Sequence, residues 1–224
     1  MSDYVANGVA GAIPLNRKSQ PSSGAVGQVF LKIFLISLLI FMLPLMIVVA
    51  VLIKLEDGGP VLFRHKRVGL GGRPFYCFKF RTMRVDAETY LAALLASDPR
   101  AREEWERDHK LRDDPRVTAV GQFLRKSSLD EVPQIINLLR GDMSVVGPRP
   151  IVEGEIAKYG WRYKHYNAVK PGLTGLWQVS GRSNVRYRRR VAMDVLYASR
   201  KSVGLDLWII AKTIPAVMQS DGSY

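Results

Sequence analysis

The chain has 224 residues, with 33 Lys and Arg against 20 Asp and Glu and a formal net charge of +13. This length holds one domain of ordinary size and a membrane element, so a second independent domain would have to be unusually small. The charge favours a polyanionic partner, but it does not choose among nucleic acid, an anionic membrane surface and a phosphorylated substrate. The single cysteine, Cys77, excludes an intrachain disulfide, and the three scattered histidines do not resemble a zinc motif.

The N-terminal part of the chain predicts a tail followed by a membrane helix. Residues 1–28 are rich in Gly, Ser, Ala and Asn and show little periodicity, which is typical of a flexible tail. From Ile33 to Ile53 there are 21 residues without a charge, and 16 of them are Leu, Ile, Val or Phe. Each such side chain favours insertion by about 0.3 to 0.6 kcal/mol, so we expect residues 29–55 to form a membrane helix. The apolar run is too long for a signal peptide, and no small-residue cleavage site follows it.

Two features bear on how this helix meets the membrane. Pro44, near the middle of the run, removes a backbone hydrogen bond and bends the helix, so that each half reaches about one leaflet deep. Positive charge marks the cytoplasmic side of a membrane, and basic residues flank both ends of the run. They are Arg17, Lys18, Lys32, Lys54, Arg64, Lys66 and Arg67. These features leave open a re-entrant hairpin, with both ends on one face, and a kinked helix that spans once.

The remainder of the chain, residues 56–224, is expected to form one domain that begins with short strands. Glycine and proline in the segment Glu56 to Pro60 end the membrane helix. Val61 to Phe63 and Pro74 to Phe80 then predict strands or extended segments around a turn at Gly69 to Gly72.

Two charged stretches follow the membrane helix. Between Arg64 and Arg84 the chain has several Lys and Arg and no acid, which suits either anionic lipid headgroups or an anionic substrate. Asp86 to Lys110 carries an apolar stripe at helical spacing, so it predicts an amphipathic surface helix that is broken near Pro99.

The stretch with the strongest chemical content runs from Arg125 to Pro150 and reads RKSSLDEVPQIINLLRGDMSVVGPRP. It places the adjacent carboxylates Asp130 and Glu131 near several arginines. The same residues also form the pattern of a capping box, in which Ser128 and Glu131 begin a helix that continues through Leu139. The pattern alone favours this capping interpretation over a catalytic one.

Several motifs in fixed order resemble the bacterial sugar transferases, a family that transfers hexose 1-phosphate to polyprenyl phosphate. They are the apolar segment with its central proline, DGGPVLFRHKRVG, FKFRTM, DPRVTAVGQFLRKSSLDEVPQIINLLRGDMSVVGPRP and KPGLTGLWQVSGRS. The resemblance covers nearly everything from the membrane segment to the C-terminus. It implies that Asp130 and Glu131 are catalytic, that the membrane helix is re-entrant, and that the enzyme needs Mg²⁺ and has a basic pocket for a diphosphate. The family commonly has Ser before the membrane proline, whereas this chain has Leu43.

The chemistry of such a transfer assigns a role to each carboxylate. Cleaving a nucleotide sugar at its pyrophosphate requires charge neutralisation on the phosphates and a nucleophile in line. The lipid acceptor is a phosphate monoester that is mostly ionised at pH 7, so a general base would contribute little. We therefore expect Asp130 to act as the nucleophile and Glu131 to hold Mg²⁺, with Asp130 close enough to share the metal. A one-step transfer with both substrates bound remains an alternative.

Basic side chains are expected to bind the phosphates of the substrate. Arg149 is the first candidate, because the prolines on both sides of it in GPRP limit the movement of its backbone. Arg125, Lys79 and Arg81 are further candidates, although each arginine could instead form a structural salt bridge. The resemblance adds Arg182, which follows Gly181, to the nucleotide-sugar pocket.

The C-terminal segment Leu205 to Met218 is apolar but too short to span a membrane, and Lys212 and Pro215 interrupt it. Trp208 near one end suits the membrane interface, while packing against the protein core is an equally good interpretation.

Three other functions fit parts of the sequence. The basic stretches and their aromatic residues suit a membrane-anchored nucleic-acid-binding protein, but no helix-turn-helix, zinc-finger or RNP-like pattern supports it. A non-catalytic scaffold would give no reason for the motif around Asp130. A conventional glycosyltransferase would release UDP rather than UMP, and the lack of an Asp-x-Asp motif favours UMP.

We therefore predict a mixed α/β, mostly helical monotopic membrane protein, with a re-entrant membrane helix broken at proline and amphipathic interfacial helices. The expected activity transfers a hexose 1-phosphate from a UDP-sugar to undecaprenyl phosphate and releases UMP, as the first step of exopolysaccharide repeat-unit synthesis. The short form and the C-terminal pattern KTIPAV...GSY resemble enzymes that use galactose 1-phosphate, and glucose 1-phosphate is the alternative. The resemblance places the enzyme in the bacterial inner (cytoplasmic) membrane, with residues 56–224 as the catalytic domain on the cytoplasmic face. Expected partners are the two substrates and membrane lipids, with no nucleic acid; the oligomeric state stays open.

Overall fold

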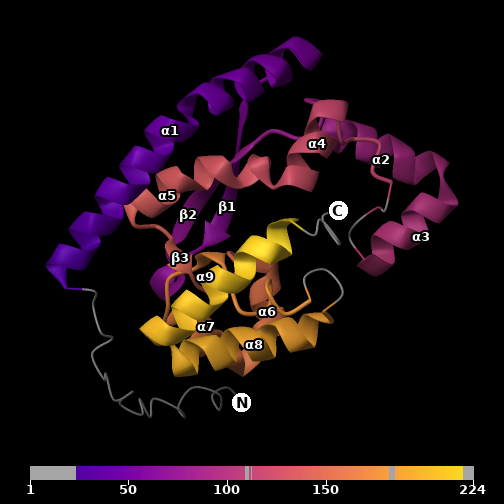
Figure 1. Ribbon diagram of the computed structural model, residues 1–224. Coiled ribbons are helices and arrows are strands. Elements are labelled where there is room, and N and C mark those ends of the chain that lie inside the picture. Colours follow the sequence, from indigo (N-terminus) through magenta and orange to yellow (C-terminus); the bar gives the residue numbers. More distant parts are fainter. Residues whose placement is uncertain (1–23, 109–110, 112, 182–184, 219–224) are drawn as a thin grey trace, which may run out of the picture.

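The protein is mostly helical, with two small sheets (Figure 1). The computed structural model describes residues 24–108, 111, 113–181 and 185–218. The helices are α1 (Ala25–Asp57), α2 (Ala87–Ser97), α3 (Pro99–Asp108), α4 (Ala119–Ser127), α5 (Ile135–Arg140), α6 (Ile156–Tyr159), α7 (Tyr163–Asn167), α8 (Tyr187–Arg200) and α9 (Val203–Met218). The 3₁₀ helices are η1 (Leu70–Gly72), η2 (Leu129–Gln134), η3 (Glu153–Glu155) and η4 (Gly160–Arg162). The strands are β1 (Leu62–Val68), β2 (Pro74–Phe80), β3 (Ser144–Val146) and β4 (Gly172–Thr174). The mixed, mostly helical fold class is confirmed.

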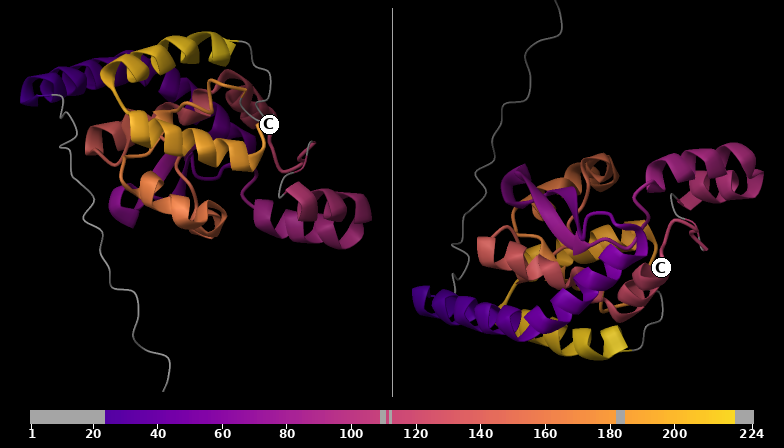
Figure 2. Two further views of the ribbon diagram at one scale, coloured as in Figure 1. Left: turned by 90° about the horizontal axis from the view of Figure 1, so that it is seen from below. Right: turned by 90° about the horizontal axis from the view of Figure 1, so that it is seen from above.

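Helix α1 contains the apolar segment and begins at Ala25, before the expected boundary at residue 29. The segment Val26–Asp57 is long and apolar enough to cross a membrane, with a peak mean hydropathy of 3.1, and 11% of that window is buried. The helix continues through Pro44 rather than breaking there, because a proline removes one backbone hydrogen bond and leaves the others in place. Figure 2 shows that α1 changes direction between its N-terminal and C-terminal parts.

One side of α1 packs against the rest of the protein along both halves of the helix. Leu35, Val49 and Ile53 are only 2–3% exposed, and the helix contacts α4 and α5. The other sides expose large apolar residues: Val29, Phe30, Ile33, Phe34, Ile40, Phe41, Leu43, Ile47, Val48, Val51 and Leu55. A helix that crosses a bilayer on its own leaves its domain at one end. The contact along both halves and the apolar outer surface therefore fit a monotopic membrane anchor.

Helix α9 meets both expectations for the C-terminal segment. Ile209 is fully buried in a core cluster with Val146 and Tyr197. The opposite side exposes Leu207 and Trp208, which are 62% and 47% exposed. Figure 2 shows α9 and α1 on the same face of the molecule in both views. The apolar surface of this face is thus built from two segments at opposite ends of the chain.

The predicted pair of strands forms an antiparallel hairpin of β1 and β2, and β1 is longer than expected. In its register, Phe63 lies opposite Lys79, His65 opposite Cys77 and Arg67 opposite Phe75. Residues directly opposite each other in an antiparallel pair point to the same face of the sheet. Lys79, His65 and Arg67 therefore share one face of the hairpin.

The charged stretch after the hairpin forms two helices, α2 and α3, separated at Pro99 as predicted. Figure 1 shows them projecting from the side of the molecule, and no residue of α2 is buried. Arg116 reaches back over the ring of Trp105 at 5.1 Å from the ring centroid. This contact links α3 to the segment that precedes α4.

Candidate active site

The acidic pair lies on η2, directly after a sharp turn at Ser128. The capping-box prediction is wrong: the Ser128 side chain makes no capping hydrogen bond, and its backbone is left-handed with φ of 57°. Among the residues that the structure describes, it is the one non-glycine residue with positive φ, a conformation that costs free energy in an L-residue. The turn ends α4 and begins a 3₁₀ helix that contains Pro133, with α5 following only from Ile135.

This turn directs both carboxylates to one lysine on β2. The Lys79 ammonium donates to Asp130 Oδ2 at 3.2 Å and to Glu131 Oε1 at 2.7 Å. Asn137, which is fully buried, holds the two elements in register: it accepts from the Phe78 backbone N–H at 3.0 Å and donates to the Tyr76 carbonyl at 2.7 Å. The free edge of β2 is thereby joined to the segment that carries the acids.

The two carboxylates have different electrostatic environments. Burial raises the pKa of Asp130 above its usual range, although Lys79 acts in the opposite direction. Burial also acts to raise the pKa of Glu131, but Lys79 and Arg149 outweigh it and hold that pKa below the usual range. Neighbouring carboxyl groups whose pKa values are pushed apart commonly have separate roles in catalysis.

Arg125 and Arg149 both line the same cavity as the acids. The Arg125 guanidinium donates to Thr82 Oγ1 at 3.0 Å and lies near enough to Asp130 to act on its pKa. Arg149 follows a close approach of two backbones, because the Gly147 N–H donates to the Thr174 carbonyl at 2.9 Å. A Cβ atom on Gly147 would lie 2.4 Å from the Lys170 carbonyl oxygen, so only glycine fits at this position. The structure therefore brings Lys79, Arg125 and Arg149 together around the acidic pair.

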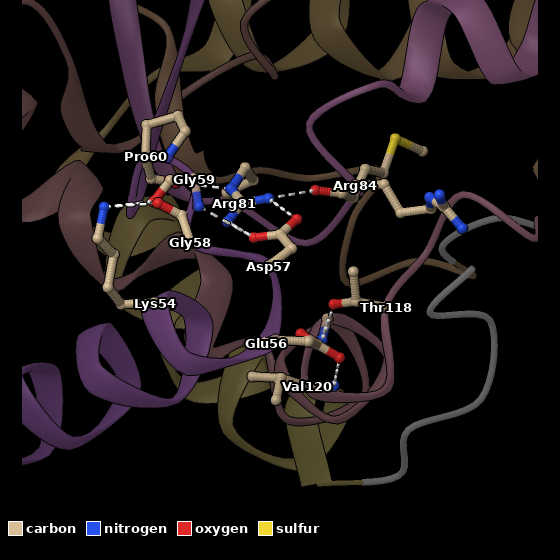
Figure 3. Close-up of polar contacts among 12 residues, drawn as sticks. Lys54, Glu56, Asp57, Gly58, Gly59, Pro60, Arg81, Arg84, Thr118 and Val120 are labelled. Atoms are coloured by element: carbon tan, nitrogen blue, oxygen red, sulfur yellow. Dashed lines mark hydrogen bonds and ion pairs between the residues drawn. The ribbon is translucent and has the colours of Figure 1, made fainter.

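Arg81 is placed differently (Figure 3). Its guanidinium forms a bidentate ion pair with Asp57 at the end of α1, and it also donates to the carbonyl of Pro60 at 2.6 Å and of Met83 at 3.2 Å. These contacts occupy Nε, Nη1 and Nη2. Next to this pair, Glu56 accepts from the Val120 N–H at the start of α4 at 3.3 Å. The end of the membrane helix is thus attached to both elements that lead to the site, β2 and α4.

We predict that Arg81→Met lowers stability, whereas the surface control Arg84→Met does not. The Arg81 side chain is 8% exposed, and its loss leaves Asp57 without a partner, which we expect to destabilise the fold by about 3 kcal/mol. Arg84 is half-exposed and pairs with Asp86 on the surface, where such a pair contributes about 0 to 1 kcal/mol. Thermal unfolding in detergent measures the difference. An unchanged melting temperature with a raised KM for the nucleotide sugar would instead assign Arg81 to substrate binding.

Two further arginines belong to the cavity and were not among the sequence candidates. Arg67 donates to the Pro150 carbonyl at 3.0 Å and acts on the pKa of Glu131. Arg190 lies over the ring of Trp177, at 4.7 Å from the ring centroid, and Arg149 lies 6.0 Å from the same centroid. The two-residue alternation of β1 was the signal for Arg67, because it puts that residue on the face of Lys79. Arg182 lies outside the described residues.

The cavity that these residues line has a volume of 2240 Å³, which is large enough for a nucleotide sugar. At one end it holds Asp130, Glu131 and the cationic side chains. Its walls also include Trp177, Gln178 and Tyr187. Within residues 24–108, 111, 113–181 and 185–218, no cluster of three or more His, Cys, Asp or Glu could hold a metal by itself. Two carboxylates whose oxygens meet at one cation do suit Mg²⁺, because Mg²⁺ takes one or two carboxylates and completes its shell with substrate phosphates and water.

This fold and site define a membrane-associated enzyme whose cavity suits an anionic substrate. The profile of a family described as bacterial sugar transferase matches residues 24–220, so the chain belongs to that family and is a transferase. The exopolysaccharide production protein ExoY of Sinorhizobium fredii is 48% identical over 205 residues, which cover 92% of this chain and 91% of that protein. The undecaprenyl-phosphate galactose phosphotransferase of Salmonella typhimurium is 47% identical over 209 residues, or 93% of this chain and 44% of that protein. The UDP-glucose:undecaprenyl-phosphate glucose-1-phosphate transferase of Caulobacter vibrioides is 41% identical over 191 residues, or 81% of this chain and 65% of that protein. The chain thus spans less than half the length of the Salmonella relative.

Proposed function

We propose that the protein transfers a hexose 1-phosphate from a UDP-sugar to undecaprenyl phosphate, as the first step of exopolysaccharide repeat-unit synthesis. The observation that carries this proposal is the buried carboxylate pair joined by Lys79 inside a cavity lined by Arg125 and Arg149. Relatives named for galactose and for glucose transfer support the class of reaction. Galactose 1-phosphate is the proposed group and glucose 1-phosphate the alternative. The reaction takes place at the cytoplasmic face of the inner membrane, where both substrates are available.

Asp130 is the proposed nucleophile. One of its carboxylate oxygens attacks the sugar-bearing phosphorus of the donor and forms a new P–O bond, while the bond from that phosphorus to the bridging oxygen breaks. The bridging oxygen leaves with UMP and takes the electron pair. The raised pKa of Asp130 fits this role, because a more basic carboxylate is a better nucleophile once it is ionised.

The lipid acceptor completes the reaction. An oxygen of its phosphate attacks the same phosphorus, and the bond to Asp130 breaks, which restores the carboxylate and gives a lipid-linked diphosphate sugar. No net proton transfer is required, because the attacking and leaving oxygens both belong to ionised phosphates or carboxylates.

The surrounding side chains stabilise the charge on the phosphates. Lys79, Arg125 and Arg149 bind and orient the phosphate oxygens, and the rigid backbone around Arg149 keeps its guanidinium in place. Glu131 and Asp130 are the proposed ligands of Mg²⁺, which would neutralise charge on the diphosphate when it is bound. The low pKa of Glu131 keeps that carboxylate ionised at neutral pH.

The nucleotide product tests the class of reaction. Purified protein in detergent is incubated with UDP-galactose or UDP-glucose, undecaprenyl phosphate and Mg²⁺, and the products are separated by chromatography. We expect UMP, with galactose as the preferred sugar. Release of UDP would instead identify a conventional glycosyltransferase, and no release with either donor would contradict the proposed substrates. Faster turnover with UDP-glucose would assign the alternative sugar.

A further inference from the structure

The cavity that holds the acidic pair has a second, apolar end. Beside the charged residues, it is lined by apolar side chains from α1 and α9 and from the elements between them. These are Phe34, Leu35 and Leu38 of α1, Ile210, Ile214 and Ala216 of α9, Ile135 and Leu138 of α5, Val145 of β3 and Leu173 of β4. One continuous space thus joins a cationic site to an apolar surface.

The apolar end opens onto the face that carries the membrane helix. Phe34 and Ile214 are each 63% exposed, so the rim of the groove is apolar where it meets the surroundings. Helices α1 and α9 lie on the same face of the molecule in both views of Figure 2. A bilayer in contact with α1 therefore also reaches the mouth of the groove between α1 and α9.

The order of residues along η2 and α5 connects the two ends. Asp130 lies at the charged end, Ile135 lies one turn further on, and Leu138 follows on the same short helix. All three line the cavity. A molecule that extends from the acidic pair towards the bilayer would follow this line and would pass from carboxylate and arginine to aliphatic side chains.

We propose that the groove between α1 and α9 binds the apolar chain of the polyprenyl phosphate acceptor, with its phosphate at Lys79 and Arg125. This inference rests on the proposed function and adds the place where the acceptor enters. The donor has a charged diphosphate and a polar sugar but no long apolar part, so it gives no reason for the apolar end. A phosphate on a long hydrocarbon chain matches both ends of the cavity in their observed order.

Substitutions that fill the groove test this assignment. Leu38→Trp and Ile214→Trp add bulk to the cavity from α1 and from α9. Their matched controls are Ile40→Trp and Ala211→Trp, on sides of the same helices that do not line the cavity. Ile40 is 66% exposed, so the added ring points into detergent or lipid.

Two assays separate the acceptor from the donor. The first measures the KM for undecaprenyl phosphate in the complete reaction. The second omits the lipid and measures the exchange of labelled UMP into the UDP-sugar, which requires only the donor half of the reaction. We expect each groove variant to raise the lipid KM at least about tenfold, the effect of roughly two methylene groups losing their apolar contact, with exchange rates within twofold of wild type. The controls should keep the wild-type lipid KM.

Equal values of the lipid KM in groove variants and controls would overturn the inference and leave the groove to an ordinary phospholipid or another partner. A parallel loss of exchange and turnover in both groove variants would also overturn it, because the substitutions would then act on the whole site. Failure of the proposed function looks different: wild type itself would show no UMP exchange or would release UDP.

Discussion

Replacing Asp130 with Asn is expected to lower turnover by at least about 10⁴-fold, the scale of losing the nucleophile in a covalent mechanism. The substitution keeps the size and most contacts of the side chain, but the amide cannot attack phosphorus. Asp130 is 9% exposed and buried beside Lys79, so its loss removes the reacting group without opening the surface. The measurement is the initial rate of UMP release with UDP-galactose, undecaprenyl phosphate and Mg²⁺.

Asp98→Asn is a matched control for this substitution. Asp98 accepts from the Arg100 N–H at 2.8 Å at the start of α3, and Asn caps a helix about as well as Asp. It does not line the cavity. We expect wild-type turnover from this variant. If Asp130→Asn kept more than a few per cent of the wild-type rate, a one-step transfer would replace the covalent mechanism.

Replacing Lys79 with Met is expected to lower kcat by at least about 10²-fold, as when one preorganised donor to a developing charge is lost. Lys79 contacts both carboxylates and lies where the substrate phosphates must approach them. Without its charge, two adjacent acids would repel each other and the anionic donor. The measurement is the kcat of UMP release at saturating concentrations of both substrates.

Lys66→Met is the control for Lys79, because Lys66 lies on the same hairpin but in the register pair of the opposite face, with Tyr76 as its partner. It is exposed, so its charge is expected to affect turnover less than twofold. Lys79→Arg should recover part of the activity, since it restores the charge. Equal losses in the two Met variants would mean that general charge, rather than the position of Lys79, sets the rate.

Much of the fold follows from local sequence patterns. The hydrophobic run predicts α1, the glycines after Asp57 predict its end, and Gly58 indeed ends the helix with φ of 70°. The two strands, the break at Pro99 and the apolar C-terminal helix are also local features, and all are present. Their success has one physical cause, since each depends on the periodicity or backbone preference of residues within a single segment.

The parts that could not be predicted depend on contacts between distant segments. The sequence of Ser128 to Glu131 fits a capping box, yet tertiary contacts draw Glu131 to Lys79 and force Ser128 into a left-handed turn. Arg81 stands in a motif with Lys79, but only the folded chain brings Asp57 against it. Whether an arginine meets an acid or a substrate is decided by three-dimensional neighbours that its sequence motif does not contain.

The most direct test of the central claim is the mass of the protein after mixing with UDP-galactose and Mg²⁺ in the absence of lipid acceptor. The account predicts that wild type gains the mass of one hexose phosphate, carried on the peptide that contains Asp130, and that Asp130→Asn gains none. The adduct should disappear when undecaprenyl phosphate is added. UMP formation that requires both substrates at once, with no adduct at any time, would contradict the role of Asp130 as the nucleophile.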